Sequence, residues 1–277
     1  MRTLALLGLV VTVIAATAVT SPVVAAALGG RFTFARVYDR VFEVLLVAGV
    51  LLAWRRLELG DAAALGLARR RWAAEFARGL VAGLGGVTLG LLLCWVGGAL
   101  TPVLRFPAEK TLRKAALGVS AALAIGAGEE VLFRGVLLRR IARDAGRVVA
   151  VAATTMIYAL VHGIRIGGHG RGPVGPWAGV ERTTALLAPL GDHTLLPGLV
   201  GLAGLGLLLA VARLRSASLW VPIGVHAAWV GVFRVGRLFF DLGHAPGWLV
   251  GPGWPPLIGG VAGWAALAAT GALLTRR

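Results

Sequence analysis

Long apolar runs are the feature of this sequence that most limits what the chain can fold into. Hydrophobic residues make up 58% of its 277 residues, and only 14% are charged. Soluble domains carry about a quarter charged residues. A run of about 20 apolar residues crosses the hydrocarbon core of a bilayer as a helix. The composition therefore predicts an integral, multi-pass membrane protein and excludes a soluble enzyme, a disordered chain and a fibrous protein.

The apolar runs predict an all-α membrane helical bundle of about eight transmembrane helices. Seven spans are the alternative, because the second run is short and contains Glu43. The first run is too long for the core of a signal peptide, so we interpret it as a span. The runs lie near residues 4–28, 41–54, 79–104, 115–138, 148–164, 195–212, 217–233 and 255–274.

The formal charge of +16 does not indicate a nucleic-acid partner. The arginines form short clusters between apolar runs, for example at 69–71 and 139–140, which is typical of cytoplasmic loops. With eight spans, these clusters share one side with both termini, so we expect both termini in the cytoplasm. The single cysteine, Cys94, allows no intramolecular disulfide and no cysteine-based metal site.

One long connection, residues 165–195, is rich in Gly and Pro. It is either an extramembrane loop or a partly re-entrant cover over a site. The remaining histidines are expected to be solvated, and the remaining acidic residues are expected to pair with arginines near the membrane interface. The histidines are His169, His193 and His244, and the expected partners are Asp39, Glu43 and Asp241.

The fourth run carries Glu129, Glu130 and Arg134. Each charge costs roughly 2.5–3.5 kcal/mol inside a membrane helix, so these residues should face protein or water and be paired. Glu130 and Arg134 are four residues apart on one helix face, in the favourable order of acid before base. Glu129 points about 100° away and lacks that partner. It suits a general base, and a purely structural ion-pair cluster is the alternative.

Two histidines, His162 and His226, lie in other apolar runs. We expect helical hairpins that turn near 143–147 and 213–215. At 1.5 Å per residue, Glu129, His162 and His226 then lie roughly 21, 22 and 16 Å from one membrane face. A carboxylate and two imidazoles at similar depth can converge on one buried point. The pattern predicts a hydrolytic site, a metal site or a proton relay.

These residues lie in three motifs that follow one another along the chain. The motifs are Glu129-Glu130-x-x-x-Arg134, Tyr158-x-x-x-His162 and Ser218-Leu219-Trp220-Val221-Pro222-Ile223-Gly224-Val225-His226. Their order and spacing resemble the CPBP family of intramembrane proteases, which comprises the type II CAAX prenyl endopeptidases and their Abi-like bacterial relatives. The resemblance covers about residues 115–235, and the second motif has Tyr where Phe is usual.

The resemblance implies an intramembrane endopeptidase that acts on a membrane-anchored protein or peptide. We expect one integral membrane domain over 1–277, with N-terminal spans in 1–114, a protease core in 115–235 and a C-terminal span in 236–277. Few lysines and much Ala, Gly, Leu and Arg indicate a bacterial inner (cell) membrane.

The resemblance also implies roles for the catalytic residues. Glu129 would accept a proton from the attacking water, and His162 would help to position that water. His226 would donate to the oxyanion, and Glu130, held by Arg134, would orient Glu129. The partners expected are therefore the substrate and the lipid bilayer, with no nucleic acid.

Whether zinc takes part is open at this level. Glu129, His162 and His226 could supply the three ligands of a catalytic zinc, or they could act without a metal. The family usually has Asn or Asp four residues after the last His, where this chain has Val230. The missing polar group removes an auxiliary ligand and one oxyanion donor, and we slightly favour the metal-free mechanism.

Two other functions fit some of these features. A non-catalytic relative that binds membrane peptides is favoured by Val230. A proton-coupled transporter would also place Glu and His at one depth, but it would usually show related halves, and none is visible.

Overall fold

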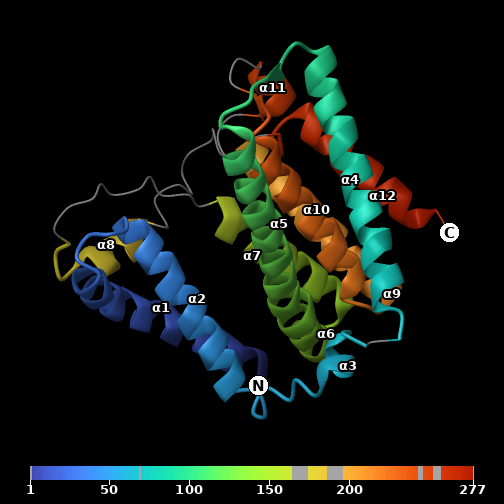
Figure 1. Ribbon diagram of the computed structural model, residues 1–277. Helices are drawn as coiled ribbons and strands as arrows, with labels where there is room; N and C mark the ends of the chain where they lie inside the picture. Colours follow the sequence, from blue (N-terminus) through green and yellow to red (C-terminus); the bar gives the residue numbers. More distant parts are fainter. Residues whose placement is uncertain are drawn as a thin grey trace. The chain divides into compact units, whose positions relative to one another are not determined.

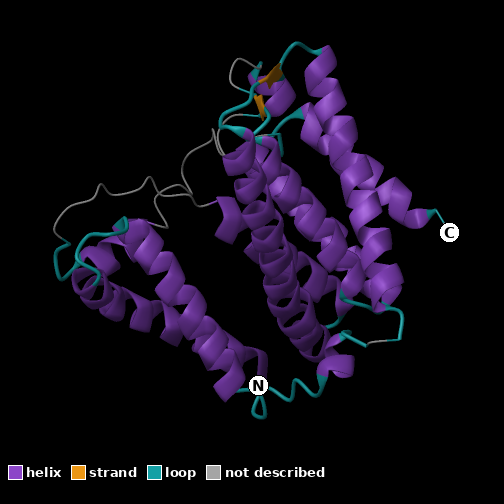
Figure 2. Ribbon diagram, in the orientation of Figure 1, coloured by secondary structure: helices purple, strands orange, loops and turns teal. Residues whose placement is uncertain are grey.

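Most of the described residues are helical (Figure 2), and the chain divides into two compact units. Unit 1 comprises Met1–Gly60 and Ile164–His193, and unit 2 comprises Asp61–Gly163 and Thr194–Arg277. The predicted all-α fold is confirmed. The computed structural model describes residues 2–68, 70–163, 174–185, 196–242, 246–251 and 257–276.

Unit 1 contains α1 (Arg2–Ala27), α2 (Phe34–Leu52) and α8 (Ala178–Ala185). α8 lies within the connection that we expected to be a loop or a cover, and it packs on α1. A Cβ at Gly179 would lie 1.9 Å from the Ala18 carbonyl oxygen, so only glycine permits this close contact. Within the described part of the connection, residues 174–185, the chain thus forms a packed helix.

Unit 2 holds the remaining elements (Figure 1). α5, η1 and α6 form one continuous helical segment, and its seven middle residues are π-helical. The elements are α3 (Ala62–Leu65), α4 (Trp72–Val96), β1 (Thr101–Pro102), α5 (Ala108–Glu130), η1 (Val131–Leu137), α6 (Leu138–Ala145), α7 (Arg147–Gly163), α9 (Leu196–Ser216), α10 (Trp220–Gly236), β2 (Phe240–Asp241), α11 (Gly247–Val250) and α12 (Val261–Thr275).

α10 lies between α4 and α5 and contacts both (Figure 1). Glycines bring these backbones together, as is typical of membrane helix pairs. A Cβ at Gly79 would lie 2.0 Å from the Val221 carbonyl oxygen, and one at Gly224 would lie 2.2 Å from that of Phe76. On the other side, a Cβ at Gly126 would lie 3.1 Å from a backbone nitrogen of α10. The close contacts fix the position of α10, which carries His226.

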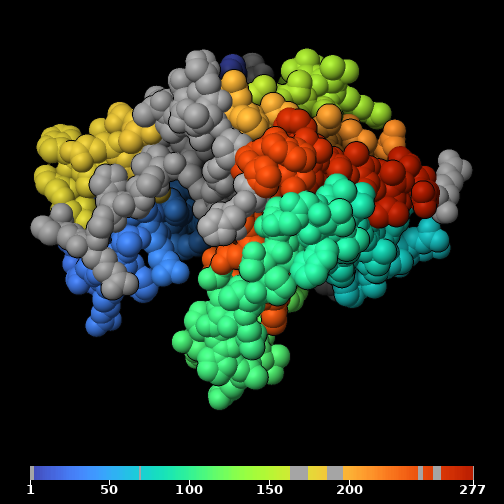
Figure 3. All heavy atoms as spheres, turned by 90° about the horizontal axis from the view of Figure 1, so that it is seen from above, coloured from blue at the N-terminus to red at the C-terminus, as the bar shows by residue number. Residues whose placement is uncertain are grey.

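The start of α5 projects from the rest of unit 2 (Figure 3). The short strand β1 precedes α5 in the sequence, and β2 follows α10. The two strands pair antiparallel, with Thr101 opposite Asp241. Lys110 and Lys114 lie over the Phe106 ring, 4.7 and 4.8 Å from its centroid. These cation–π contacts place the two lysines of the chain at one end of α5.

Each predicted apolar run overlaps a helix of the structure. Among the described residues, four helices are long and apolar enough to cross a membrane, which supports an integral membrane protein. The total of eight spans and the single-domain organisation stay predictions. The four helices are Thr3–Ala27, Trp72–Val96, Ala108–Ala145 and Leu196–Ser216, and the shorter apolar ones are Arg147–His162 and Val261–Thr275.

The two expected hairpins have different outcomes. The turn near 143–147 is confirmed, since only Gly146 separates α6 from α7. The position predicted for the second turn, 213–215, is wrong, because α9 continues through these arginines to Ser216. The Ser216 hydroxyl donates to the Ala212 carbonyl and accepts from the backbone N–H of Ser218. These bonds place the turn at residues 217–219.

The three acidic residues expected to pair with arginines do so. Asp39 pairs with Arg182 at 3.1 Å within unit 1. The other two ion pairs are Glu43 with Arg40 and Asp241 with Arg105.

Candidate active site

The junction of α5 and η1 places the two adjacent carboxylates and the arginine. Glu129 and Glu130 are the last residues of α5, and Arg134 lies in the π-helical turn that follows. π-Helical turns inside α-helices occur frequently at functional sites. No sequence pattern predicted this turn, because single-residue propensities carry no signal for it.

Glu130 and Arg134 form a fully buried ion pair. The guanidinium Nη1 lies 2.9 Å from Glu130 Oε1, and both side chains are 0% exposed. Arg134 also donates through Nη2 to the carbonyl oxygen of Gly206 on α9, at 3.0 Å. The arginine therefore links the α5–η1 junction to α9.

Aromatic rings enclose the same guanidinium. Its central carbon lies 4.7 Å from the ring centroid of Tyr158 and 5.5 Å from that of Phe133. The two rings meet edge to face at 5.3 Å. Cation–π contacts are strongest where water is excluded, so these rings help to compensate the burial of Arg134.

α10 brings His226 to both carboxylates. Its Nδ1 lies 2.8 Å from Glu130 Oε1, and its Nε2 lies 3.7 Å from Glu129 Oε2. The residue is buried, with 2% of its surface exposed. Because a carboxylate only accepts, Nδ1 donates to Glu130 and Nε2 faces Glu129.

α7 brings His162 to Glu129 from another side. The His162 Nδ1 donates to the Tyr158 carbonyl oxygen at 2.9 Å, one turn earlier in the helix. The two rings are stacked with centroids 4.1 Å apart. His162 Nε2 lies 2.9 Å from Glu129 Oε2. Stacking and the backbone hydrogen bond fix the ring so that Nε2 points at the carboxylate.

Exposure separates the members of this cluster. The side chains of Glu129 and His162 are 30% and 26% exposed, whereas those of Glu130, Arg134 and His226 are nearly or fully buried. The structure therefore brings together all five residues that the sequence singled out, and it leaves Glu129 and His162 accessible. The site residues that sequence reasoning did not identify are Phe133, which has no distinctive spacing, and the Gly206 carbonyl, which has no side-chain signal.

The described side chains do not match a metal site. Among the described residues, no group of three His, Cys, Asp or Glu is arranged to hold a metal ion. Glu129 and His162 lie in direct hydrogen-bond contact. We therefore derive no step through zinc. The loop histidines His169, His193 and His244 lie outside the described residues.

Val230 lies one turn after His226 on α10 and is partly buried. Its aliphatic side chain carries no hydrogen-bond donor or acceptor. The structure thus has no polar side chain at the position where the resemblance implied one.

A comparison with known families agrees with the motifs. The family described as type II CAAX prenyl endopeptidase Rce1-like matches residues 111–232. No curated protein and no solved structure matches the chain. The matched segment begins in α5 and ends in α10, and it contains Glu129, His162 and His226. Residues 111–232 are therefore similar to the Rce1-like family of type II CAAX prenyl endopeptidases, in agreement with the resemblance that the three motifs indicated.

Proposed function

We propose that the chain hydrolyses a peptide bond of a membrane-associated protein or peptide by means of a water molecule activated by Glu129. The observation that carries this proposal is the exposure of Glu129 and His162 at the edge of an otherwise buried polar cluster. A general base must reach the proton that it accepts, directly or through one water. Glu129 meets this requirement, and the buried Glu130 does not.

The Glu129–His162 contact can hold the transferred proton. His162 Nδ1 donates to a backbone carbonyl, so Nε2 can accept a hydrogen bond from Glu129 across the 2.9 Å contact once that carboxylate has taken up a proton. As the water oxygen bonds to the scissile carbonyl carbon, Glu129 accepts a proton from that water. The pair then delivers a proton to the leaving amine as the C–N bond breaks.

His226 supports the oxyanion in this proposal. Its Nδ1 proton is committed to Glu130, so its Nε2 can donate only when the ring is an imidazolium. One oxyanion donor of this type contributes about 2.7–4 kcal/mol to the transition state. Val230 adds no second donor from the next turn.

The buried ion pair has a positioning role. Arg134 holds Glu130, and Glu130 holds the His226 ring through Nδ1. We propose that this chain of contacts fixes His226 and the end of α5 relative to Glu129. No metal is used in this mechanism.

We propose a bacterial cell membrane as the location, with both termini in the cytoplasm. The substrate is a membrane-anchored protein or peptide, because the site lies on helices that are apolar along most of their length.

Reconstitution in liposomes tests the function. A library of peptides tethered to lipid is offered to the wild-type chain and to Glu129→Gln, and the same peptides without the lipid serve as controls. We expect the wild type to cleave tethered peptides in preference to soluble ones, and Glu129→Gln to be inactive. A zinc chelator should leave the rate unchanged. Loss on chelation with recovery on adding zinc would overturn the metal-free mechanism but not the protease.

One observation favours a second function. Val230 stands one turn after His226, where the resemblance implies a polar side chain. The alternative is therefore that the chain is a relative that binds membrane peptides without cleaving them. In the same liposomes, this alternative predicts retained peptide binding with no cleavage by the wild type.

A further inference from the structure

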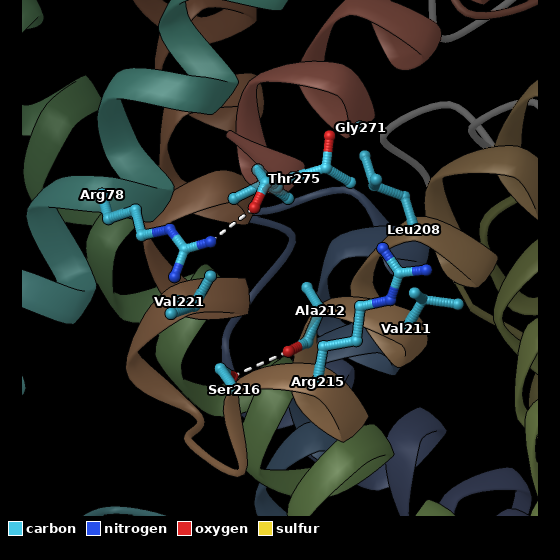
Figure 4. A pocket seen from close by; sticks show the side chains of 10 residues that line it. Arg78, Leu208, Val211, Ala212, Arg215, Ser216, Val221, Gly271 and Thr275 are labelled. Carbon is cyan, nitrogen blue, oxygen red and sulfur yellow. Dashed lines mark hydrogen bonds between the residues drawn. The ribbon is translucent and has the colours of Figure 1, made fainter. Parts of the chain in front are cut away.

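A cavity separate from the candidate active site lies among the helix ends of unit 2 (Figure 4). It has a volume of about 650 Å³, within the range of small-molecule sites. The start of α4, the end of α9, the start of α10 and the end of α12 form its walls. None of the five residues of the candidate active site lines it.

The charged groups of this cavity are all positive. Arg78 of α4 and Arg215 of α9 lie on opposite sides of it in Figure 4, and no acidic side chain of the described residues lines it. Both arginines are exposed, and within the described residues neither has a carboxylate partner. Arg78 donates to the carbonyl oxygen of Leu274 near the end of α12, which directs its guanidinium across the cavity. The cavity therefore complements an anion.

The remaining wall is mostly apolar and extends along the helices. Leu208 and Val211 lie deeper in α9 than Arg215, and Gly271 faces Leu208 from α12 without a side chain of its own. α4 and α9 are long and apolar enough to cross a membrane, so their ends lie near its surface. Arg78 and Arg215 thus lie near the membrane surface, and the apolar wall extends from them toward the membrane interior.

We propose that this cavity binds an anionic phospholipid. The lipid phosphate lies between Arg78 and Arg215, and the first part of an acyl chain lies along Leu208 and Val211 beside Gly271. Basic pockets between transmembrane helices bind anionic headgroups in this way. A free phosphate would satisfy the arginines but would leave the apolar wall uncovered. The proposal is independent of the proposed catalytic function.

Native mass spectrometry of the purified chain tests the proposal. The probes are phosphatidylglycerol and phosphatidylcholine with identical acyl chains, and glycerol 3-phosphate as a soluble competitor. The variants are Arg215→Gln, which breaks no contact within the described residues, and Gly271→Leu, which places a side chain in the cavity. Arg143→Gln removes an exposed charge of α6 that does not line the cavity, and it is the matched control.

We expect phosphatidylglycerol to be retained in preference to phosphatidylcholine. Arg215→Gln should weaken retention about fivefold, as expected for one basic residue at an anionic lipid headgroup. Gly271→Leu should weaken it as well, whereas Arg143→Gln and glycerol 3-phosphate should have no effect. The melting temperature without added lipid confirms that each variant is folded.

Three outcomes would overturn the proposal. Equal retention of both lipids would mean that charge does not select the ligand. Equal losses in Arg215→Gln and Arg143→Gln would mean that the lipid responds to net charge and not to this cavity. Displacement by glycerol 3-phosphate would assign a soluble phosphate ligand in place of a lipid.

Discussion

Two regions of the candidate active site use the same residue types in opposite surroundings. The buried half consists of Glu130, Arg134 and His226, and the open half consists of Glu129 and His162. In the buried half, the Glu130 carboxylate contacts the Arg134 guanidinium and the His226 imidazole, and its side chain has no exposed surface. In the open half the carboxylate contacts one imidazole at 2.9 Å and keeps part of its surface free.

Two adjacent residues of one helix, Glu129 and Glu130, thus lie in different environments and can have different roles. Successive side chains on a helix point about 100° apart, so Glu129 and Glu130 cannot share one environment. A charge in a dry region is tolerated only with partners, and those partners fix its geometry. A charge at an accessible edge can exchange protons with water. We therefore propose proton transfer for the open half, and for the buried half the positioning of the site together with the oxyanion contact of His226.

The largest effect is expected from breaking the buried half. Arg134→Ala leaves Glu130 as an uncompensated buried charge, which costs about 3–5 kcal/mol of stability. The melting temperature in detergent and the yield of folded protein should fall. Arg143→Ala, at an exposed position of the same helical segment, should change neither. A wild-type melting temperature for Arg134→Ala would show that the pair is not part of the folded core.

Removing the partner in the open half should change the rate more than the stability. His162→Ala takes away the group that shares a proton with Glu129, and cleavage should fall by about 10²-fold. Its melting temperature should stay closer to the wild type than that of Arg134→Ala, since the His162 side chain is partly exposed. Activity near the wild-type level would remove His162 from the mechanism.

A substitution outside the site can move His226 away from both Glu129 and Glu130. Gly224→Ala places a Cβ 2.2 Å from the Phe76 carbonyl oxygen, so α10 must move away from α4. Overpacking of this kind costs about 1–3 kcal/mol. In Gly231→Ala, on the same helix, the Cβ would lie 3.7 Å from that of Ala122, an ordinary contact. The melting temperatures of the two variants should therefore differ, and equal values would contradict the packing that we describe.

The smallest effect is expected from substitutions of Tyr158, which contacts His162 of the open half. Tyr158 contacts His162 through its ring and through its backbone carbonyl, and both remain in Tyr158→Phe. The cleavage rate should stay near the wild type. Tyr158→Ala loses the stacking, worth about 0.5–1.5 kcal/mol, and should lower the rate by about tenfold. A large loss in Tyr158→Phe would instead assign a role to the phenolic hydroxyl.

Much of this arrangement could be predicted from the sequence because the constraints are strong. Apolar runs locate helices reliably, and each of the expected runs overlaps one. Charged residues inside such runs are costly, so Glu129, Glu130 and Arg134 stand out without any structure. The hairpin at Gly146 then places His162 at the depth of Glu129, as the 2.9 Å contact shows.

The rest depends on contacts that the sequence does not encode locally. The π-helical turn at Val131–Leu137 and the bond from Arg134 to the Gly206 carbonyl arise from packing. The turn after α9 lies beyond the arginines at which we expect it, because long basic side chains can reach the membrane surface from within a helix. α8 was not expected, because its short stretch has little apolar periodicity.

The most direct test of the division between the halves is a paired measurement on Glu129→Gln and Glu130→Gln. For each variant, the cleavage of one tethered peptide and the melting temperature are measured in the same preparation. We predict that Glu129→Gln loses about 10²–10⁴-fold in rate with nearly unchanged melting, because Gln fills the space but cannot accept the proton. Glu130→Gln should lower the melting temperature, because Arg134 loses its buried counter-charge. Cleavage by Glu129→Gln at the wild-type rate would contradict the account.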